Sequence, residues 1–83
     1  MRIERIVSTG QTTPENEWLN QAWDEWVLLI AGAARLAMAG SPDRRLECGD
    51  HLLIPAGTAH RVTWTDPDRP TIWLAVHLGE SPR

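Results

Sequence analysis

Two residue types that often carry enzyme chemistry, lysine and tyrosine, are missing from this chain. All eight basic residues are arginine, and phenylalanine is absent as well. Without lysine there is no Schiff base, no P-loop lysine and no lysine general base. Without tyrosine there is no phenolic acid, and five tryptophans are the only residues with large aromatic rings. These absences remove several classes of covalent and acid catalysis from consideration.

Cysteine and long apolar runs are scarce too. The single cysteine, Cys48, cannot form an internal disulfide or a Cys-x-x-Cys metal site, and a free thiol suits a reducing compartment. The longest apolar run, Trp26 to Ala34, is about half of the roughly 20 residues that a spanning helix needs. The first residues, Met1 to Glu4, lack a signal-peptide pattern. We therefore expect a cytoplasmic protein that has no membrane segment.

A continuous basic surface is also missing. The eight arginines are scattered among eleven acidic residues, and the formal net charge is -3. Nucleic-acid-binding proteins usually neutralise phosphates with a basic stripe, so we expect no nucleic-acid partner. What remains is an ordinary globular composition, 42% hydrophobic and 23% charged. A chain of 83 residues has room for one core, which predicts a single domain over residues 1–83.

Short β-forming segments follow one another along most of the chain. The ambiguous stretch is Trp18 to Met38, whose tryptophans and alanines also fit a helical stripe, so a helix is the alternative there. Strands are favoured because Trp26 to Ile30 is a continuous β-forming run, Gly32 marks a turn or bulge, and Arg35 to Ala39 alternates. Further strands are expected over residues 2–7, 44–48, 51–54, 60–65 and 71–78. About seven or eight short strands predict an all-β sandwich or barrel.

The stretch from Gly49 to Val62 carries the most specific pattern. It consists of a glycine, five residues, Pro55, one residue, Gly57, two residues and His60. This spacing resembles the second sequence motif of the cupin family, except that Trp64 stands at the closing position, where asparagine is usual. The resemblance implies a small cupin-type barrel, that is, a double-stranded β-helix or jelly roll.

The first cupin motif is present only in its second half. Glu25 is followed after six residues by Gly32, as the motif requires. Its two histidine positions fall, depending on the spacer, at Leu19 and Gln21 or at Trp18 and Asn20. In metal-binding cupins three histidines and the glutamate hold iron, manganese, zinc or nickel, so only Glu25 and His60 carry over as ligands. Two ligands rarely hold a divalent ion tightly, and the resemblance therefore implies a degenerate metal site.

Each ionisable candidate has a functional and a structural interpretation. His60 is a metal ligand or acid–base group inside the barrel, or it caps the turn through a backbone hydrogen bond. Glu25 is a general acid or ligand, or it is paired with an arginine or a histidine. His77 completes a metal set with Glu25 and His60 if its strand face looks inward, or it is structural. His51 is expected at the surface.

Amide side chains at the former histidine positions indicate a different chemistry. Gln21 and Asn20 are weak donors to transition metals and suit hydrogen bonds to a small polar ligand better. We predict a ligand site formed by Gln21, Glu25, His60 and Trp64. The tryptophans could line such a pocket, but the core is the expected place for most of them.

Three functions follow from these residues. The first is a barrel that binds a small polar or metabolite ligand in its lumen. The alternatives are a metal-dependent enzyme of the oxygenase, isomerase or lyase type, and a structural or regulatory homodimer. A homodimer is expected in any case, partly as the family's habit and partly because both faces of Thr71 to Leu78 are apolar and are expected to be covered.

Overall fold

The computed structural model describes residues 1–79, and in this part of the chain every regular element is a β-strand. The strands are β1 (Arg2–Ser8), β2 (Asp24–Ala31), β3 (Ala33–Met38), β4 (Arg44–Glu47), β5 (His51–Ile54), β6 (His60–Thr65) and β7 (Thr71–Leu78). The all-β prediction is confirmed, and the helical alternative for Trp18 to Met38 is wrong. Within residues 1–79, no helix has the length and apolarity to cross a bilayer.

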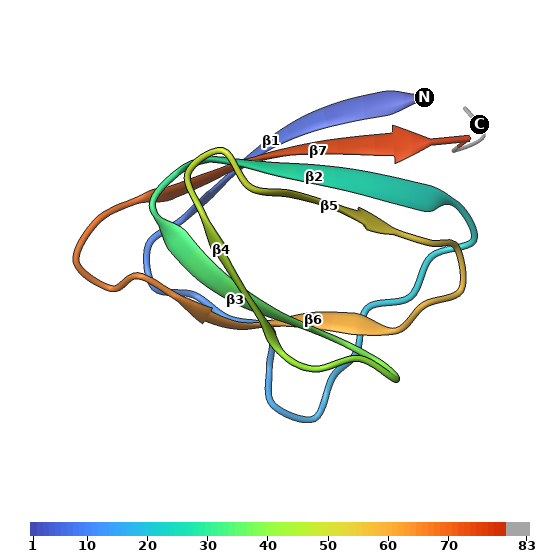
Figure 1. Ribbon diagram of the computed structural model, residues 1–83, viewed down its shortest axis with the longest axis horizontal. Helices are drawn as coiled ribbons and strands as arrows, with labels where there is room; N and C mark the ends of the chain where they lie inside the picture. Colours follow the sequence, from blue (N-terminus) through green and yellow to red (C-terminus); the bar gives the residue numbers. More distant parts are fainter. Residues whose placement is uncertain (80–83) are drawn as a thin grey trace.

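The strands form two antiparallel sheets that face each other. One sheet has the order β1-β7-β2-β5 and the other the order β4-β3-β6. Figure 1 shows the two layers enclosing a common interior, with β3 and β4 crossing below β2 and β5. The strand pattern predicted a sandwich or a barrel, and the two facing sheets form a small β-barrel.

Gly32 carries the chain from one sheet to the other. It lies between β2 and β3, just after a bulge between Leu29 and Ala31, and its φ is +86°. A Cβ atom at this position would lie 2.5 Å from Thr71 Oγ1 and 2.6 Å from Thr71 Cα. Because both the backbone angle and the available space exclude a side chain, the predicted turn at Gly32 is confirmed and has a physical cause.

The core lies between the sheets and is built from inward-facing aliphatic residues. Trp73 is the one tryptophan among the described residues that is buried in it. Trp18 is 49% exposed and Trp26 is half-buried on the outer side of β2, so the expectation that most tryptophans fill the core is wrong. The buried apolar cluster consists of Val27, Leu29, Ala34, Leu36, Leu46, Leu52, Ile54, Trp73 and Ala75.

The outward side of the four-stranded sheet is also apolar, and we call it the outer apolar face. Cross-strand pairing places Ile3, Val76, Trp26 and Leu53 in one row across all four strands. Exposed large apolar residues on this face are Ile3, Val7, Ile30, Leu53 and Leu78. In the single chain, β7 is therefore covered on its inner side only. The expectation that both of its faces are covered is wrong for the single chain.

Candidate functional site

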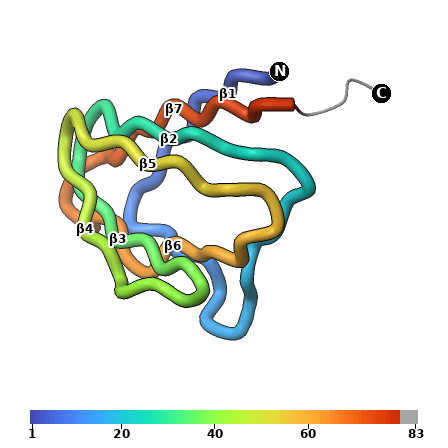
Figure 2. The backbone as a smooth tube through the Cα atoms, turned by 45° about the vertical axis from the view of Figure 1, so that its right-hand side comes forward, coloured from blue at the N-terminus to red at the C-terminus, as the bar shows by residue number. Residues whose placement is uncertain are grey.

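A cavity of about 410 Å³ lies between the two sheets. Its apolar wall includes Ile6, Val27, Leu36, Ile54, Val62 and Trp73. Its polar residues include Glu4, Gln21, Glu25, His60 and His77. Leu19, Asn20, Gln21 and Trp23 also line it, and they belong to the connection from β1 to β2, residues 9–23, which Figure 2 shows passing β6. This connection is tied to β6 by two backbone hydrogen bonds between Leu19 and His60, 2.7 and 2.9 Å long.

Strand alternation brings Glu25 and His77 together. Glu25 on β2 pairs directly with His77 on β7 and, on its other side, with Ile54 on β5. Directly paired residues in antiparallel strands point to the same face, which here is the inner one. The condition set for His77, that its strand face looks inward, is therefore met, and both side chains line the cavity.

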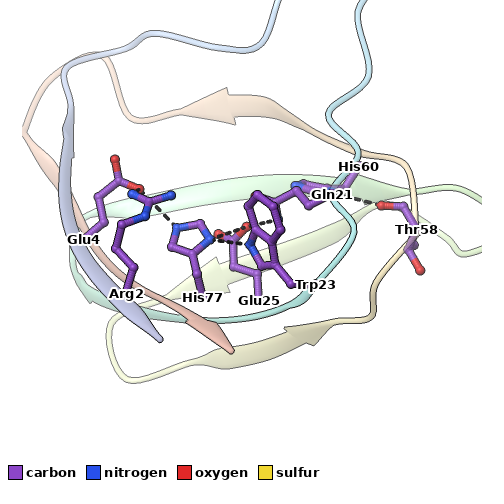
Figure 3. A network of polar contacts seen from close by, with 8 residues as sticks. All are labelled: Arg2, Glu4, Gln21, Trp23, Glu25, Thr58, His60 and His77. Carbon is purple, nitrogen blue, oxygen red and sulfur yellow. Dashed lines mark hydrogen bonds and ion pairs between the residues drawn. The ribbon is translucent and has the colours of Figure 1, made fainter. Parts of the chain in front are cut away.

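His77 is held on both ring nitrogens. The indole N–H of Trp23 donates to Nδ1 at 2.9 Å, and Nε2 lies 3.2 Å from Glu4 Oε1. Because an indole N–H can only donate and a carboxylate only accepts, Nδ1 carries the lone pair and Nε2 carries the proton. Figure 3 shows Glu4, His77 and Trp23 following one another across the cavity. The imidazole is thus fixed in one tautomer and one orientation.

Glu25 is a buried carboxylate whose neighbours are mostly neutral. It is 8% exposed, and its Oε1 accepts a hydrogen bond from the Gln21 amide at 2.5 Å. The same oxygen lies 4.0 Å from Nδ1 of His77, which has no proton in the tautomer set by Trp23. The other oxygen, Oε2, has no hydrogen-bond partner among the described residues. Glu25 therefore faces the cavity, and no arginine among residues 1–79 forms an ion pair with it.

His60 makes the turn-capping contact and also lines the cavity, while a role as metal ligand or acid–base group stays a prediction. It is 4% exposed, and its Nδ1 donates to the carbonyl oxygen of Thr58 at 3.0 Å, which caps the turn between β5 and β6. With the proton on Nδ1, Nε2 of the neutral ring is an acceptor. The turn itself is anchored to β2 because Asp24 Oδ1 accepts from the backbone N–H of Ala56 at 2.7 Å. His60 is thus both a turn cap and a cavity residue.

Comparison with known proteins agrees with this architecture. The family model of the cupin domain matches residues 5–77. The chain belongs to the cupin family. No match to this cupin is found among curated proteins.

The solved structures that are similar to this cupin carry names that refer to different functions. A proposed mannose-6-phosphate isomerase from Ralstonia eutropha JMP134 is 46% identical, with a TM-score of 0.88, and the match covers 90% of this cupin and 70% of that chain. The DMSP lyase DddQ from Ruegeria pomeroyi DSS-3 is 28% identical, with a TM-score of 0.72 and coverage of 95% and 41%. The Drosophila melanogaster CENP-C cupin domain, 13% identical with a TM-score of 0.75 and coverage of 90% and 59%, shares the fold.

The donor set of this cupin does not fit a mononuclear metal site. Leu19 and Gln21, which stand at histidine positions of the first motif, offer an apolar side chain and an amide already bonded to Glu25. Both nitrogens of His77 are engaged. Among residues 1–79, no three His, Cys, Asp or Glu side chains are grouped so that they could hold one ion. The metal set of Glu25, His60 and His77 stays a prediction, although all three line one cavity.

Trp64 lies outside the cavity, which corrects its predicted place in the ligand site. Trp64 pairs with Arg35 on β3, whereas Val62 pairs with the next residue, Leu36, so Thr63 is an extra residue in β6. Such a bulge reverses the alternation of inward and outward side chains. Trp64 consequently turns away from the lumen, and the Arg45 guanidinium lies 5.5 Å from the centre of its ring.

Two residues of the site were missed by the sequence arguments. Trp23 and Glu4 orient His77, yet neither belongs to a cupin motif. The signal for Trp23 was its spacing, since Gln21, Trp23 and Glu25 are each two residues apart and project to one side of an extended chain. Glu4 had no such signal, because its role depends on the pairing of β1 with β7.

Proposed function

We propose that this cupin binds a small polar molecule in the cavity between its sheets and does not depend on a resident metal to do so. The supporting observation is that Glu25 and His60 are both buried and each keeps an acceptor atom open to the same largely apolar cavity. Ligand pockets typically combine roughly 300 to 1,000 Å³ of mostly apolar space with a few convergent polar groups. The cavity fits this description.

Catalysis on the bound molecule is the second candidate. Its support is the pair of His77 and Glu25, because an imidazole held at both nitrogens beside a carboxylate resembles the oriented acid–base groups of enzymes. An isomerase or a lyase reaction, suggested by the names of two similar proteins, belongs to this proposal. Turnover assays with small hydroxy and carbonyl compounds distinguish it from binding alone.

Ligand binding is tested by NMR titration with sugars, organic acids and small amines. We expect at least one class to give saturable shifts of signals from the cavity residues, and we expect His60→Ala to weaken that binding. His51→Ala is the matched control, because His51 is exposed on the outer side of β5. If no compound gives saturable shifts, or if both variants behave alike, the proposed binding site is wrong.

Metal analysis of the purified protein tests the metal-free part of the proposal. We expect iron, manganese, zinc and nickel well below one equivalent per chain, because Glu25 and His60 are the only motif ligands present. One equivalent of metal that disappears in His60→Ala would support the metal-dependent alternative instead.

We also propose that two chains associate through the outer apolar face. The row of Ile3, Val76, Trp26 and Leu53 and its neighbours form an apolar sheet surface of the kind that mediates association. A two-fold dimer would bury this surface on both chains. A cytoplasmic location remains an expectation based on the single thiol, Cys48, which is exposed and free.

A further inference from the structure

The lining of the cavity, as far as residues 1–79 form it, contains carboxylates and no arginine. Two carboxylates, Glu4 and Glu25, line it together with two histidines, and no arginine is among the lining residues. Glu4 is compensated at the edge, where its Oε1 lies 3.3 Å from Arg2 Nη1. Glu25 has the amide of Gln21 and the unprotonated Nδ1 of His77 as neighbours. The deeper carboxylate is therefore the uncompensated one, and a buried charge without a partner is unfavourable.

The ring N–H groups around the cavity are already used within the protein. Trp23 donates to His77, and Trp73 donates to the Ser8 hydroxyl at 3.3 Å. His77 donates to Glu4, and His60 donates to Thr58. These rings therefore have no N–H group left to donate to a ligand. They can contribute only a hydrogen-bond acceptor.

Two acceptor atoms stay open to the cavity. Among the described residues, the one fully buried side-chain polar atom without a partner is Nε of Arg61. Glu25 Oε2 and His60 Nε2, which have no partner among residues 1–79, are therefore not sealed off by other atoms of this part of the chain. His60 itself is 4% exposed, so its free nitrogen can be reached only through the cavity that it lines. In Figure 3, Glu25 belongs to the row of contacts that includes Gln21 and His77, whereas the His60 ring is bonded to Thr58.

We propose that the cavity selects a small protonated amine, whose N–H groups are accepted by Glu25 and His60 and whose carbon skeleton packs against the apolar wall that includes Trp73. This rests on the proposed function, since it names the class of ligand for the same cavity. The ammonium group supplies a positively charged partner for Glu25. Its N–H groups also supply the hydrogen-bond donors that the two acceptor atoms need. An organic anion would face Glu25 and Glu4, and no arginine of residues 1–79 lines the cavity to pair with it.

The test compares three compounds with one carbon skeleton: cyclohexylammonium, cyclohexanol and cyclohexanecarboxylate. Binding is followed by calorimetry and by the indole N–H signals of Trp23 and Trp73 in NMR spectra. We expect the amine to bind roughly tenfold or more tightly than the alcohol, since charge-assisted hydrogen bonds are about twice as strong as neutral ones. We expect the carboxylate to bind more weakly than both.

Two glutamine variants show whether Glu25 causes the preference. Glu25→Gln keeps the size of the side chain and removes its charge, so amine and alcohol should then bind about equally. Glu47→Gln is the control, because Glu47 is an exposed β4 residue beside Arg45, outside the lining of the cavity. It should leave the preference of the amine unchanged.

The outcomes separate this inference from the proposed function. If the alcohol or the carboxylate binds as tightly as the amine to the unaltered protein, the cavity binds ligands but the inference is wrong. If none of these compounds or those of the wider panel binds, the proposed function fails. Because the comparison is made first on the unaltered protein, poor folding of Glu25→Gln would not rescue the inference.

Discussion

At the level of single residues, the notable feature is that His77 has one fixed tautomer. Trp23 and Glu4 occupy its two nitrogens from different parts of the chain, one from the connection before β2 and one from β1. Glu25 lies 4.0 Å from the nitrogen that Trp23 holds. Trp23 and Glu25 thus offer competing arrangements for Nδ1, since the indole requires it unprotonated and the carboxylate favours a proton there.

Replacing Trp23 by phenylalanine should release His77 from this single state. Nitrogen chemical shifts of the imidazole should show only the Nε2–H form in the unaltered protein and a measurable Nδ1–H population in Trp23→Phe. The free energy of unfolding should fall by about 1 kcal/mol, the net value of one hydrogen bond. Trp26→Phe, on the outer side of β2, is the control and should leave the His77 signals unchanged.

Asp66 provides a prediction for the dependence of stability on pH. Its Oδ1 accepts from the backbone N–H of Asp68 and its Oδ2 from Arg69, both at 2.8 Å, and these bonds hold the pKa of Asp66 below its ordinary value of 3.8. A lowered pKa in the folded state means that the stabilisation is complete above the ordinary value and is lost as the pH falls through the folded one.

We therefore expect Asp66→Asn to be less stable than the unaltered protein near neutral pH. The difference in free energy of unfolding should shrink when denaturation is measured below pH 3.8. An equal difference at both pH values would mean that the charge of Asp66 is not what stabilises the loop between β6 and β7.

At the level of elements, the sequence predicted strands well and side-chain direction less well. The Pro55 and Gly57 turn and the strands around it were predictable because turn residues and β-forming runs are local signals. Trp64 was misplaced because the extra residue in β6 comes from its pairing with β3, which no local pattern reveals. The link from Glu4 to His77 likewise depends on register between distant strands.

Gly32 and Gly49 provide a matched test of the corner between the sheets. Both have positive φ, +86° and +91°, so alanine should cost about 1 to 2 kcal/mol of strain at either position. Only at Gly32 would the new Cβ also collide with Thr71, whereas nothing lies within 4 Å at Gly49. Urea denaturation should show Gly32→Ala to be less stable than Gly49→Ala by about a further 2 kcal/mol. Equal losses would show that Thr71 moves aside without cost.

At the level of the whole molecule, the two sheets differ in their outer surfaces. The outer side of β3 and its neighbours carries Arg35, Arg45 and Trp64, with Arg35 bound to Asp43 at 2.9 Å. The four-stranded sheet instead presents the outer apolar face. The proposed dimer uses the second surface because burying it removes apolar area from water and leaves few charges behind.

Leu74→Glu should therefore convert the dimer to a monomer. Leu74 lies between Arg5 and Leu28 in the pairing of the four-stranded sheet, so a carboxylate there would be buried in the interface. Light scattering coupled to size-exclusion chromatography gives the mass. Ala37→Glu, an apolar-to-charged change on the outer side of β3, is the control and should keep the dimer. A monomeric unaltered protein would refute the proposal.

The position of β1 has a consequence for how fast a ligand can exchange. β1 is at the end of its sheet and bonds to β7, yet it supplies Glu4, Ile6 and Ser8 to the cavity wall. An edge strand can open locally at less cost than a strand bonded on both sides. Release of β1 would uncover the cavity while the rest of the barrel stays folded. The residence time of a ligand would then depend on main-chain hydrogen bonds between β1 and β7, and not only on the groups that touch it.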